Sequence, residues 1–320
     1  MTLSVWQVLL FFAGIALLVW GLHALAWHLL NALISTMDRL PLLRQTRAWA
    51  RVRPLQAWLR LRHPRLHAIL AARLRPKPFI GLPLTLLVLG AFYVAGLLGG
   101  LTGEVLEAGA ILRFDQAVNA AFGAWRMRPL FGIFLWITAL GAGPALTAVA
   151  VVATAFLWAD RRPGFILPLW VAFLGAQATT WSGKFVIARH RPDFIHAVFE
   201  ASPSFPSGHA TASMALYGFL AYALVRDLPG RRKRFEVAFW VAVLVLAIGF
   251  SRIFLSLHYT TDVAAGFMVG AFWLLVGFAV SEWTRDRRPA PIPLDAQHPA
   301  TDAGAPRCRN RHLRVRKRRV

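Results

Sequence analysis

The chain has 320 residues, of which 57% are hydrophobic, and it carries a formal net charge of +22. Soluble domains are about 45–50% apolar. Here the excess falls in runs of about 20 residues, long enough to cross a bilayer core of roughly 30 Å. These properties exclude a soluble globular enzyme and predict an all-α polytopic membrane protein. The one cysteine, Cys308, permits no intrachain disulfide and lacks metal-ligand spacing, so redox and zinc chemistry are excluded too.

The positive charge gathers in two stretches. Residues 36–78 hold 11 Arg and Lys against one acidic residue, and residues 284–320 hold 11 against three. A basic chain is typical of nucleic-acid binding, but both stretches flank apolar runs, where basic residues set topology and bind anionic headgroups. We therefore expect membrane lipids as partners and no nucleic acid. The sequence indicates no oligomeric state.

Taken in chain order, the apolar runs predict seven membrane spans. They lie at about residues 4–34, 80–101, 130–158, 164–188, 208–225, 235–255 and 260–282. The first run is too long for a signal peptide and follows no basic residue, so residues 1–35 are expected to remain as a transmembrane helix. The third run exceeds one straight span, and Gly141-Ala142-Gly143-Pro144 is predicted to break it into a short interfacial helix and the span proper.

Residues 36–78 are expected to form an amphipathic helix on the membrane surface, interrupted by Pro54 and Pro64. Its apolar side chains are Trp49, Leu55, Trp58, Leu61, Leu66 and Leu70. A regulatory or partner-binding role is the alternative for this segment. Residues 79–283 are expected to form one transmembrane domain, in which 102–129 is a connection of balanced charge. The tail 284–320 is predicted to be disordered.

The charges also predict a topology. Basic connections are cytoplasmic by the positive-inside rule, and seven spans then put the N-terminus outside and the C-terminus inside. Three polar segments fall on the outer face: the end of the fourth span, the start of the fifth and the turn before the seventh. Ionisable residues at membrane depth are costly and mark functional sites.

The first polar segment holds Lys184, the one of four lysines that lies within an apolar helix. Arg191 follows seven residues later on the same helix face, and Pro192 then ends the helix. With Arg252 from another span, these cations form a cluster suited to a polyanion, and phosphate fits best. Snorkelling to the interface is the alternative for Lys184. Arg189 is expected either to contact a headgroup or phosphate or to lie at the interface.

The second segment, Pro206-Ser207-Gly208-His209, has the features of a helix start. Ser207 is a favoured N-cap, and free amides at the positive end of a helix bind anions. Gly208 allows the backbone to approach a ligand closely, and His209 is placed to exchange a proton with it. A capping or interfacial role is the alternative for His209 alone.

The third segment places Ser251, Arg252, His258 and Asp262 within an apolar stretch. His258 and Asp262 are four residues apart and would share one face of a helix. A carboxylate so placed orients an imidazole and stabilises it when protonated.

These segments read Lys-x6-Arg-Pro, Pro-Ser-Gly-His and Ser-Arg-x5-His-x3-Asp, and they resemble the three signature motifs of the type 2 phosphatidic acid phosphatase superfamily. The match covers roughly residues 80–282. The resemblance implies a six-helix phosphatase core, to which this chain adds one N-terminal transmembrane helix. It also implies catalysis without a metal or other cofactor, and no Asp/Glu cluster in the sequence resembles a magnesium site.

The resemblance further implies a role for each motif residue. His258 is expected to be the nucleophile that forms a phosphohistidine, with Asp262 orienting it. His209 is expected to protonate the leaving group and then to activate water. The residues expected to bind the phosphoryl oxygens are Lys184, Arg191, Ser207, Gly208, Ser251 and Arg252.

The function that the resemblance implies is hydrolysis of a lipid phosphate or diphosphate by an integral membrane phosphatase. We expect a bacterial inner membrane protein with a periplasmic site and a cytoplasmic C-terminus. Undecaprenyl diphosphate is the favoured substrate, followed by phosphatidic acid, phosphatidylglycerophosphate and lipid A phosphates. A lipid phosphotransferase and a non-catalytic lipid transporter are the alternatives, whereas the family's haloperoxidases are soluble and therefore disfavoured.

Overall fold

The computed structural model describes residues 5–44, 57–73, 82–126, 128–192 and 200–286, and within these ranges it contains helices and no strand. The helices are α1 (Val5–Arg44), α3 (Pro64–Arg73), α4 (Leu82–Glu107), α5 (Ala110–Ala121), α6 (Arg128–Ala139), α7 (Gly143–Ala159), α8 (Ile166–Ile187), α9 (Gly208–Val225), α10 (Arg231–Phe254) and α11 (Thr260–Asp286). Trp49, Pro54, Leu55 and all of the predicted tail beyond Asp286 lie outside the described residues.

Among the described residues, five helices are long and apolar enough to cross a membrane, and α6 with α7 would make a sixth span. The two helices of that pair meet at an angle of 43°, which confirms the predicted break at 141–144. The all-α, multi-span class is thereby confirmed. The helix over residues 208–225 is present as α9 but is not one of the five. Other helices surround it, so it can carry buried Thr211 and Ser213 in place of a uniformly apolar surface.

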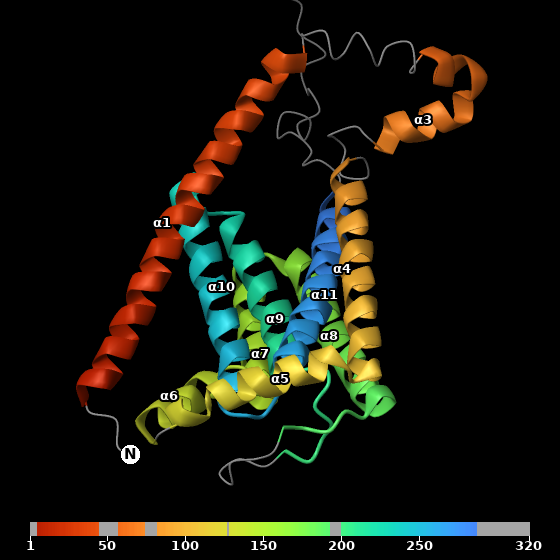
Figure 1. The fold of residues 1–320 in the computed structure, drawn as a ribbon. Helices are drawn as coiled ribbons and strands as arrows, with labels where there is room; N and C mark the ends of the chain where they lie inside the picture. The colour runs from red at the N-terminus through yellow and green to blue at the C-terminus, as the bar shows by residue number, and fades with distance from the viewer. Residues whose placement is uncertain (1–4, 45–56, 74–81, 127, 193–199, 287–320) are drawn as a thin grey trace, which may run out of the picture. The chain divides into compact units, whose positions relative to one another are not determined.

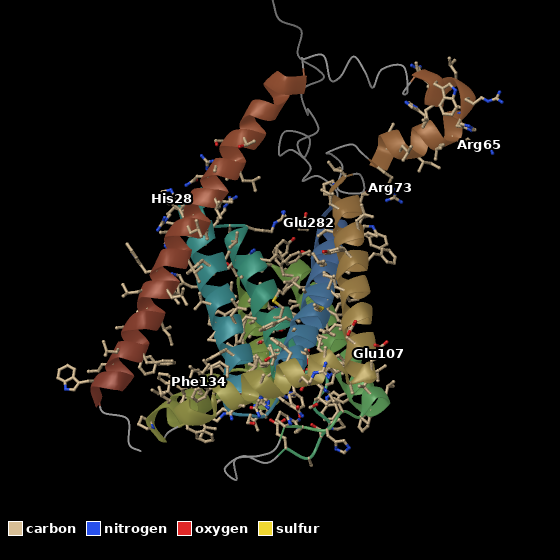
Figure 2. The ribbon with its side chains drawn as sticks, in the orientation of Figure 1. His28, Arg65, Arg73, Glu107, Phe134 and Glu282 are labelled. Carbon is tan, nitrogen blue, oxygen red and sulfur yellow. The ribbon has the colours of Figure 1, made fainter. Side chains whose placement is uncertain are left out.

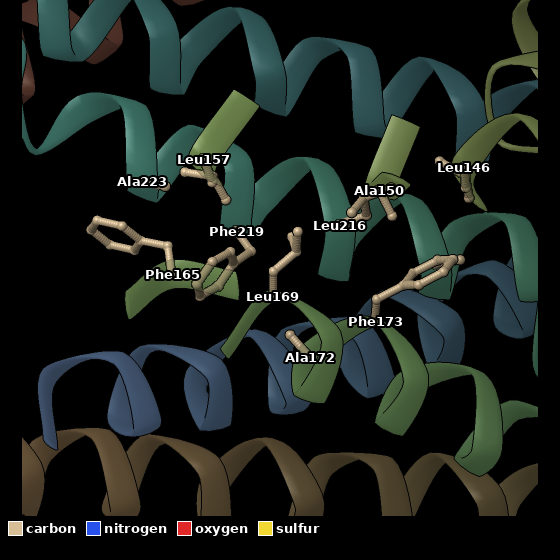
Figure 3. Close-up of a cluster of buried hydrophobic side chains, with 11 residues drawn as sticks. Leu146, Ala150, Leu157, Phe165, Leu169, Ala172, Phe173, Leu216, Phe219 and Ala223 are labelled. Atoms are coloured by element: carbon tan, nitrogen blue, oxygen red, sulfur yellow. The ribbon is translucent and has the colours of Figure 1, made fainter. Parts of the chain in front are cut away.

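The central helix is α9, which packs against α7, α8, α10 and α11 (Figure 1). Its Leu216 and Phe219 join a cluster of buried side chains that includes Leu146 of α7 and Leu169 and Phe173 of α8 (Figure 3). Within a bilayer such contacts stabilise a bundle through close packing. The cluster therefore holds α7, α8 and α9 together, and the polar segments lie at the ends of α8 and α9.

Two glycines bring α11 unusually close to α9. A Cβ added at Gly266 would lie 2.6 Å from the carbonyl oxygen of Ser207, and one added at Gly270 would lie 2.6 Å from that of Thr211. Real Cβ atoms do not approach a backbone oxygen so closely, so only glycine fits at both positions without moving a helix. This approach holds the start of α9 next to the first turn of α11.

One helix is absent from the sequence prediction. The connection predicted over residues 102–129 contains α5, and α4 continues to Glu107 before it. A helix of twelve residues is too short to span a bilayer. Instead α5 and α6 lie across one end of the bundle, the lower end in Figures 1 and 2. Ile111 of α5 packs on the buried cluster formed by Val105, Phe205 and Ala265.

The N-terminal segments agree in part with the prediction. Transmembrane α1 extends to Arg44, about three turns past the predicted end of the first span. It contacts α10 through His23 Nε2, which lies 2.9 Å from a carboxylate oxygen of Glu236. Residues 57–62 and α3 are helical and are separated at His63, next to the predicted break at Pro64.

We expect Gly270→Ala to lower the thermal stability of the detergent-solubilised protein. The added methyl group would meet the Thr211 carbonyl, and overpacking of this kind costs about 1–3 kcal/mol. Gly99→Ala in α4 is the matched control, because nothing lies within 4 Å of its added Cβ. That control should be neutral or slightly stabilising, since alanine favours a helix over glycine by about 1 kcal/mol. Equal melting temperatures for the two variants would contradict the close approach of α9 and α11.

Candidate active site

The polar segments meet where four helix ends converge. The carboxyl ends of α8 and α10 and the amino ends of α9 and α11 lie together beside α5 (Figure 1). Between them is a cavity of about 390 Å³. Its lining includes Gly141, Gly143, Lys184, Glu200, Gly208, His209 and His258. The basic turns between α7 and α8 and between α9 and α10 lie at the other end of the bundle, as the sequence predicts.

The sequence predicts that His258 and Asp262 share a helix. In the structure, His258 instead lies in the turn between α10 and α11. The two side chains nevertheless lie close together, because Asp262 is in the first turn of α11 and its Oδ2 lies 3.5 Å from Nδ1 of His258, which makes no hydrogen bond at this separation. On the other side of the ring, Nε2 lies 3.3 Å from Nη1 of Arg191. A carboxylate at Nδ1 and a guanidinium at Nε2 favour the tautomer with its proton on Nδ1 and its lone pair on Nε2.

The surroundings of His258 also keep it neutral. Burial lowers the pKa of the imidazole well below its usual value, and the positive charges of Arg252 and Arg191 lower it further. A neutral imidazole with its lone pair on Nε2 is the form that acts as a nucleophile once Nε2 leaves its contact with Arg191.

Lys184 is buried and does not snorkel to the interface. Its Nζ donates to Ser202 Oγ at 2.9 Å and to the Pro203 carbonyl at 2.6 Å. The ammonium group therefore faces the cavity from α8 while it holds the segment that leads into α9.

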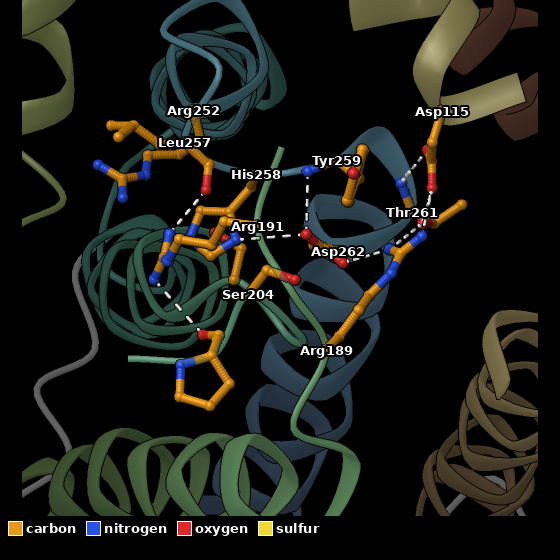
Figure 4. A network of polar contacts seen from close by, with 12 residues as sticks. Asp115, Arg189, Arg191, Ser204, Arg252, Leu257, His258, Tyr259, Thr261 and Asp262 are labelled. Carbon is orange, nitrogen blue, oxygen red and sulfur yellow. Dashed lines mark hydrogen bonds and ion pairs between the residues drawn. The ribbon is translucent and has the colours of Figure 1, made fainter. Parts of the chain in front are cut away.

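Arg191 reaches the site by a different route from the predicted one. Helix α8 ends at Ile187, because Ala188 adopts a left-handed conformation with φ of 49°, so Arg191 does not share a helix face with Lys184. It lies in the segment beyond, where Nε donates to the Ser202 carbonyl at 2.7 Å. Its Nη1 donates to the Leu257 carbonyl at 2.6 Å (Figure 4). The second bond fixes Arg191 to the turn that carries His258.

Sequence reasoning assigned no role to Glu200, yet its carboxylate pairs with two of the expected phosphate-binding residues. One oxygen lies 2.7 Å from Nη2 of Arg191, and the other pairs with Nη2 of Arg252. Partial burial acts to raise the pKa of Glu200, but the charges of Arg252 and Arg191 prevail and lower it to about 2. Glu200 is therefore an anion at any working pH. The signal for it was weak, since an acid in a loop is ordinarily solvated.

Several buried donors at this end of the bundle have no partner. Ser207 occupies the N-cap position of α9 as predicted, but its hydroxyl makes no capping bond. Within the described part of the chain, Ser207 Oγ and Arg252 Nε are buried without a hydrogen-bond partner. Unpaired buried donors are costly, and the amide of Gly208 lies beside them at the positive end of α9. The arrangement suits an anionic ligand.

Ser251 differs from the other expected phosphate-binding residues. Its hydroxyl donates to the Ile248 carbonyl at 2.6 Å, within its own helix. Of the expected phosphate-binding residues, Lys184 and Gly208 line the cavity, whereas Arg191, Ser207, Ser251 and Arg252 do not. Arg189 pairs within the protein, with the carboxylates of Asp262 and Asp115. In the described residues, no three His, Cys, Asp or Glu side chains are arranged to hold a metal ion.

The chain is similar to known membrane phosphatases. The sequence profile of the PAP2 superfamily matches residues 165–286. Phosphatidylglycerophosphatase B of Bacillus subtilis (strain 168) is 33% identical over 176 residues, which are 54% of this chain and 87% of that protein. Lipid A 1-phosphatase of Rhizobium johnstonii is 35% identical over 127 residues, which are 34% of this chain and 48% of that protein.

The fold is also similar to that of a solved membrane phosphatase. The crystal structure of a transmembrane PAP2 type phosphatidylglycerolphosphate phosphatase from Bacillus subtilis superposes with a TM-score of 0.56 at 30% identity. The superposition covers 62% of this chain and 97% of that one.

We expect Glu200→Gln to bind inorganic phosphate about tenfold more tightly or better, because phosphate no longer competes with a carboxylate for Arg191 and Arg252. Calorimetric titration of the detergent-solubilised protein measures this. Since the pKa of Glu200 is about 2, the carboxylate is fully charged and the gain should be constant between about pH 5 and 8.

Asp160→Asn is the control, because Asp160 pairs with Arg162 at the opposite end of the bundle. Weaker phosphate binding in Glu200→Gln would contradict competition and would show that the carboxylate is needed to hold the arginines in place.

Proposed function

The chain belongs to the PAP2 superfamily of membrane lipid phosphatases, and on this premise we propose that it cleaves a lipid phosphate or diphosphate through a phosphohistidine on His258. The observation that carries the proposal is the position of His258, a buried imidazole at the wall of the cavity that Lys184 also lines. Asp262 lies 3.5 Å from its Nδ1, and Arg191 lies 3.3 Å from its Nε2. Among the described residues, Glu200 is the one carboxylate in an ion pair with the cluster of Lys184, Arg191 and Arg252, and this charge balance favours a polyanionic ligand.

In the first step, the Nε2 lone pair of His258 forms a bond to phosphorus while the bond between phosphorus and the lipid oxygen breaks. Burial among cations favours neutral His209 in the empty site, and the negative charge of a bound phosphoryl group favours its protonated form. Protonated in this way, His209, on the first turn of α9 at the cavity wall, donates its proton to the departing oxygen. Asp262 stabilises the positive charge that the imidazole gains. The lipid product leaves and a phosphohistidine remains.

In the second step, water attacks the phosphorus and the bond from phosphorus to Nε2 breaks. His209, now neutral, takes a proton from the water, and inorganic phosphate is released. Lys184, Arg191 and Arg252 stabilise the charge on the phosphoryl oxygens in both steps. The donors that add to them are the hydroxyl of Ser207, the amide of Gly208 and, if its hydroxyl turns from Ile248, Ser251.

The residues named above are proposed to bind the phosphoryl oxygens, and such contacts do not distinguish one lipid tail from another. The sequence alone favours undecaprenyl diphosphate, and the similarity to a phosphatidylglycerophosphatase raises phosphatidylglycerophosphate, already a candidate, to the same rank. We place the enzyme in a bacterial inner membrane with the site on the periplasmic face and the C-terminus in the cytoplasm. The position of the basic turns, at the end of the bundle opposite the cavity, supports this orientation.

The test is phosphate release by the purified protein in detergent with EDTA, offered undecaprenyl diphosphate, phosphatidylglycerophosphate and phosphatidic acid separately. We expect release without added metal, and we expect His258→Ala to reduce it by at least about 1,000-fold, since loss of a nucleophile has effects of this size or larger. Full activity in His258→Ala would sink the phosphohistidine mechanism. A second phosphorylated lipid in place of free phosphate would identify a phosphotransferase.

A further inference from the structure

Arg189 lies between two buried carboxylates. Its Nη1 donates to Oδ1 of Asp262 at 2.5 Å and its Nη2 to Oδ2 of Asp115 at 2.9 Å (Figure 4). The guanidinium also stacks over the ring of Tyr259, 4.4 Å from its centroid. Because the nitrogen atoms of a guanidinium are fixed in one plane, Arg189 sets the direction of the Asp262 carboxylate relative to Asp115.

Asp115 comes from α5, outside all three sequence motifs, and is only 1% exposed. Besides Arg189, it accepts the backbone N–H of Thr261 at 3.1 Å and the hydroxyl of Thr261. Thr261 is in the first turn of α11, next to Asp262. A single carboxylate on α5 therefore holds both the arginine and the helix start on which the partner of His258 depends.

Asp262 is fully buried and divides its two oxygens between different neighbours. Oδ1 accepts from Arg189, whereas Oδ2 accepts the Tyr259 N–H at 2.9 Å and faces Nδ1 of His258. The charge that His258 experiences from Asp262 thus depends on how strongly Arg189 is drawn to Asp262, and Asp115 competes for the same guanidinium. Charges at such distances act strongly where water is excluded.

We propose that Asp115 is a positioning residue for the proposed reaction, which acts through Arg189 on the orientation and effective charge of Asp262 and so on His258. Neither Asp115 nor Arg189 lines the cavity. The proposal rests on the function proposed above. It extends the catalytic assembly to α5, a helix with no motif residue.

The experiment compares Asp115→Asn and Arg189→Gln with the wild type in phosphate release and in the pH profile of kcat/KM. We expect kcat to fall about 10- to 100-fold in each, as for other groups that orient a catalytic imidazole, with KM changed less than about threefold. The acid limb of kcat/KM reports protonation of His258 in the free enzyme. It should move to lower pH in Asp115→Asn, which loses a negative charge, and to higher pH in Arg189→Gln, which loses a positive one.

Other groups near His258 set the baseline of that profile and are unchanged in both variants. The charged and titratable groups that face His258 are Asp262 of α11, Arg252 of α10, His209 of α9, Lys184 of α8, and Arg191 and Glu200 between α8 and α9. An NMR titration of His258 in labelled protein follows the same two shifts without any substrate. It therefore separates failure of this proposal from failure of the proposed function.

Three controls isolate the effect of charge. Asn119→Ala removes a second buried contact of α5, to Arg126 and Ser256, without changing charge, and should leave the acid limb in place. Gln116→Lys makes the same change in charge as Asp115→Asn on the exposed face of α5, where solvent screens it. Arg189→Lys keeps the charge and should keep the limb near its wild-type position, even if Arg189→Gln fails to fold.

Two results would overturn the proposal. One is wild-type kcat in Asp115→Asn. The other is an equal loss of activity in Asp115→Asn and Asn119→Ala with no movement of the His258 titration, because α5 would then act only as a scaffold.

Discussion

Mutual repulsion among Lys184, Arg191 and Arg252 is the constraint around which this end of the molecule is built. Like charges brought together away from water repel strongly, and each of these side chains is held by acceptors that offset part of that cost. The Pro203 carbonyl accepts from Lys184, and the carbonyls of Ser202 and Leu257 accept from Arg191. Glu200 pairs with both arginines. The offset is incomplete, since three cations share the carboxylate of Glu200 in the described part of the site, and this excess of positive charge underlies the proposed binding of a phosphoryl group.

Packing elsewhere in the bundle supplies the rigidity that this arrangement needs. Helix α9 is surrounded by its neighbours. Gly266 and Gly270 let the backbone of α11 approach the backbone of α9 closely. As a result, the Gly208 amide at the start of α9 and the Asp262 carboxylate in the first turn of α11 are held in fixed positions relative to each other. Donors held in place in this way stabilise developing charge without reorganising.

The spans, the α6–α7 break and the convergence of the polar segments were predictable, because hydropathy, loop charge and motif spacing are local properties of the sequence. The routes by which residues reach the site were not. Ala188 ends α8 early, so Arg191 arrives from an extended segment, and His258 comes from a turn. Glu200 and Asp115 were missed because each pairs with an arginine far away in the sequence. Arg252 is 52 residues from Glu200, and Arg189 is 74 residues from Asp115. Helix α5 was missed because it is short and carries no long apolar run.

The attachment of α5 to the start of α11 bears on how this protein can be divided. The stretch that matches the PAP2 superfamily profile begins at residue 165, whereas the carboxylate bound to Arg189 is contributed at residue 115. A chimera that moved only the matched stretch into a relative would carry Arg189 and Asp262 but leave Asp115 behind, so Arg189 would be separated from one of its two carboxylate partners. The smallest exchangeable module of this enzyme is therefore larger than the segment by which its family is identified, and it begins before α5.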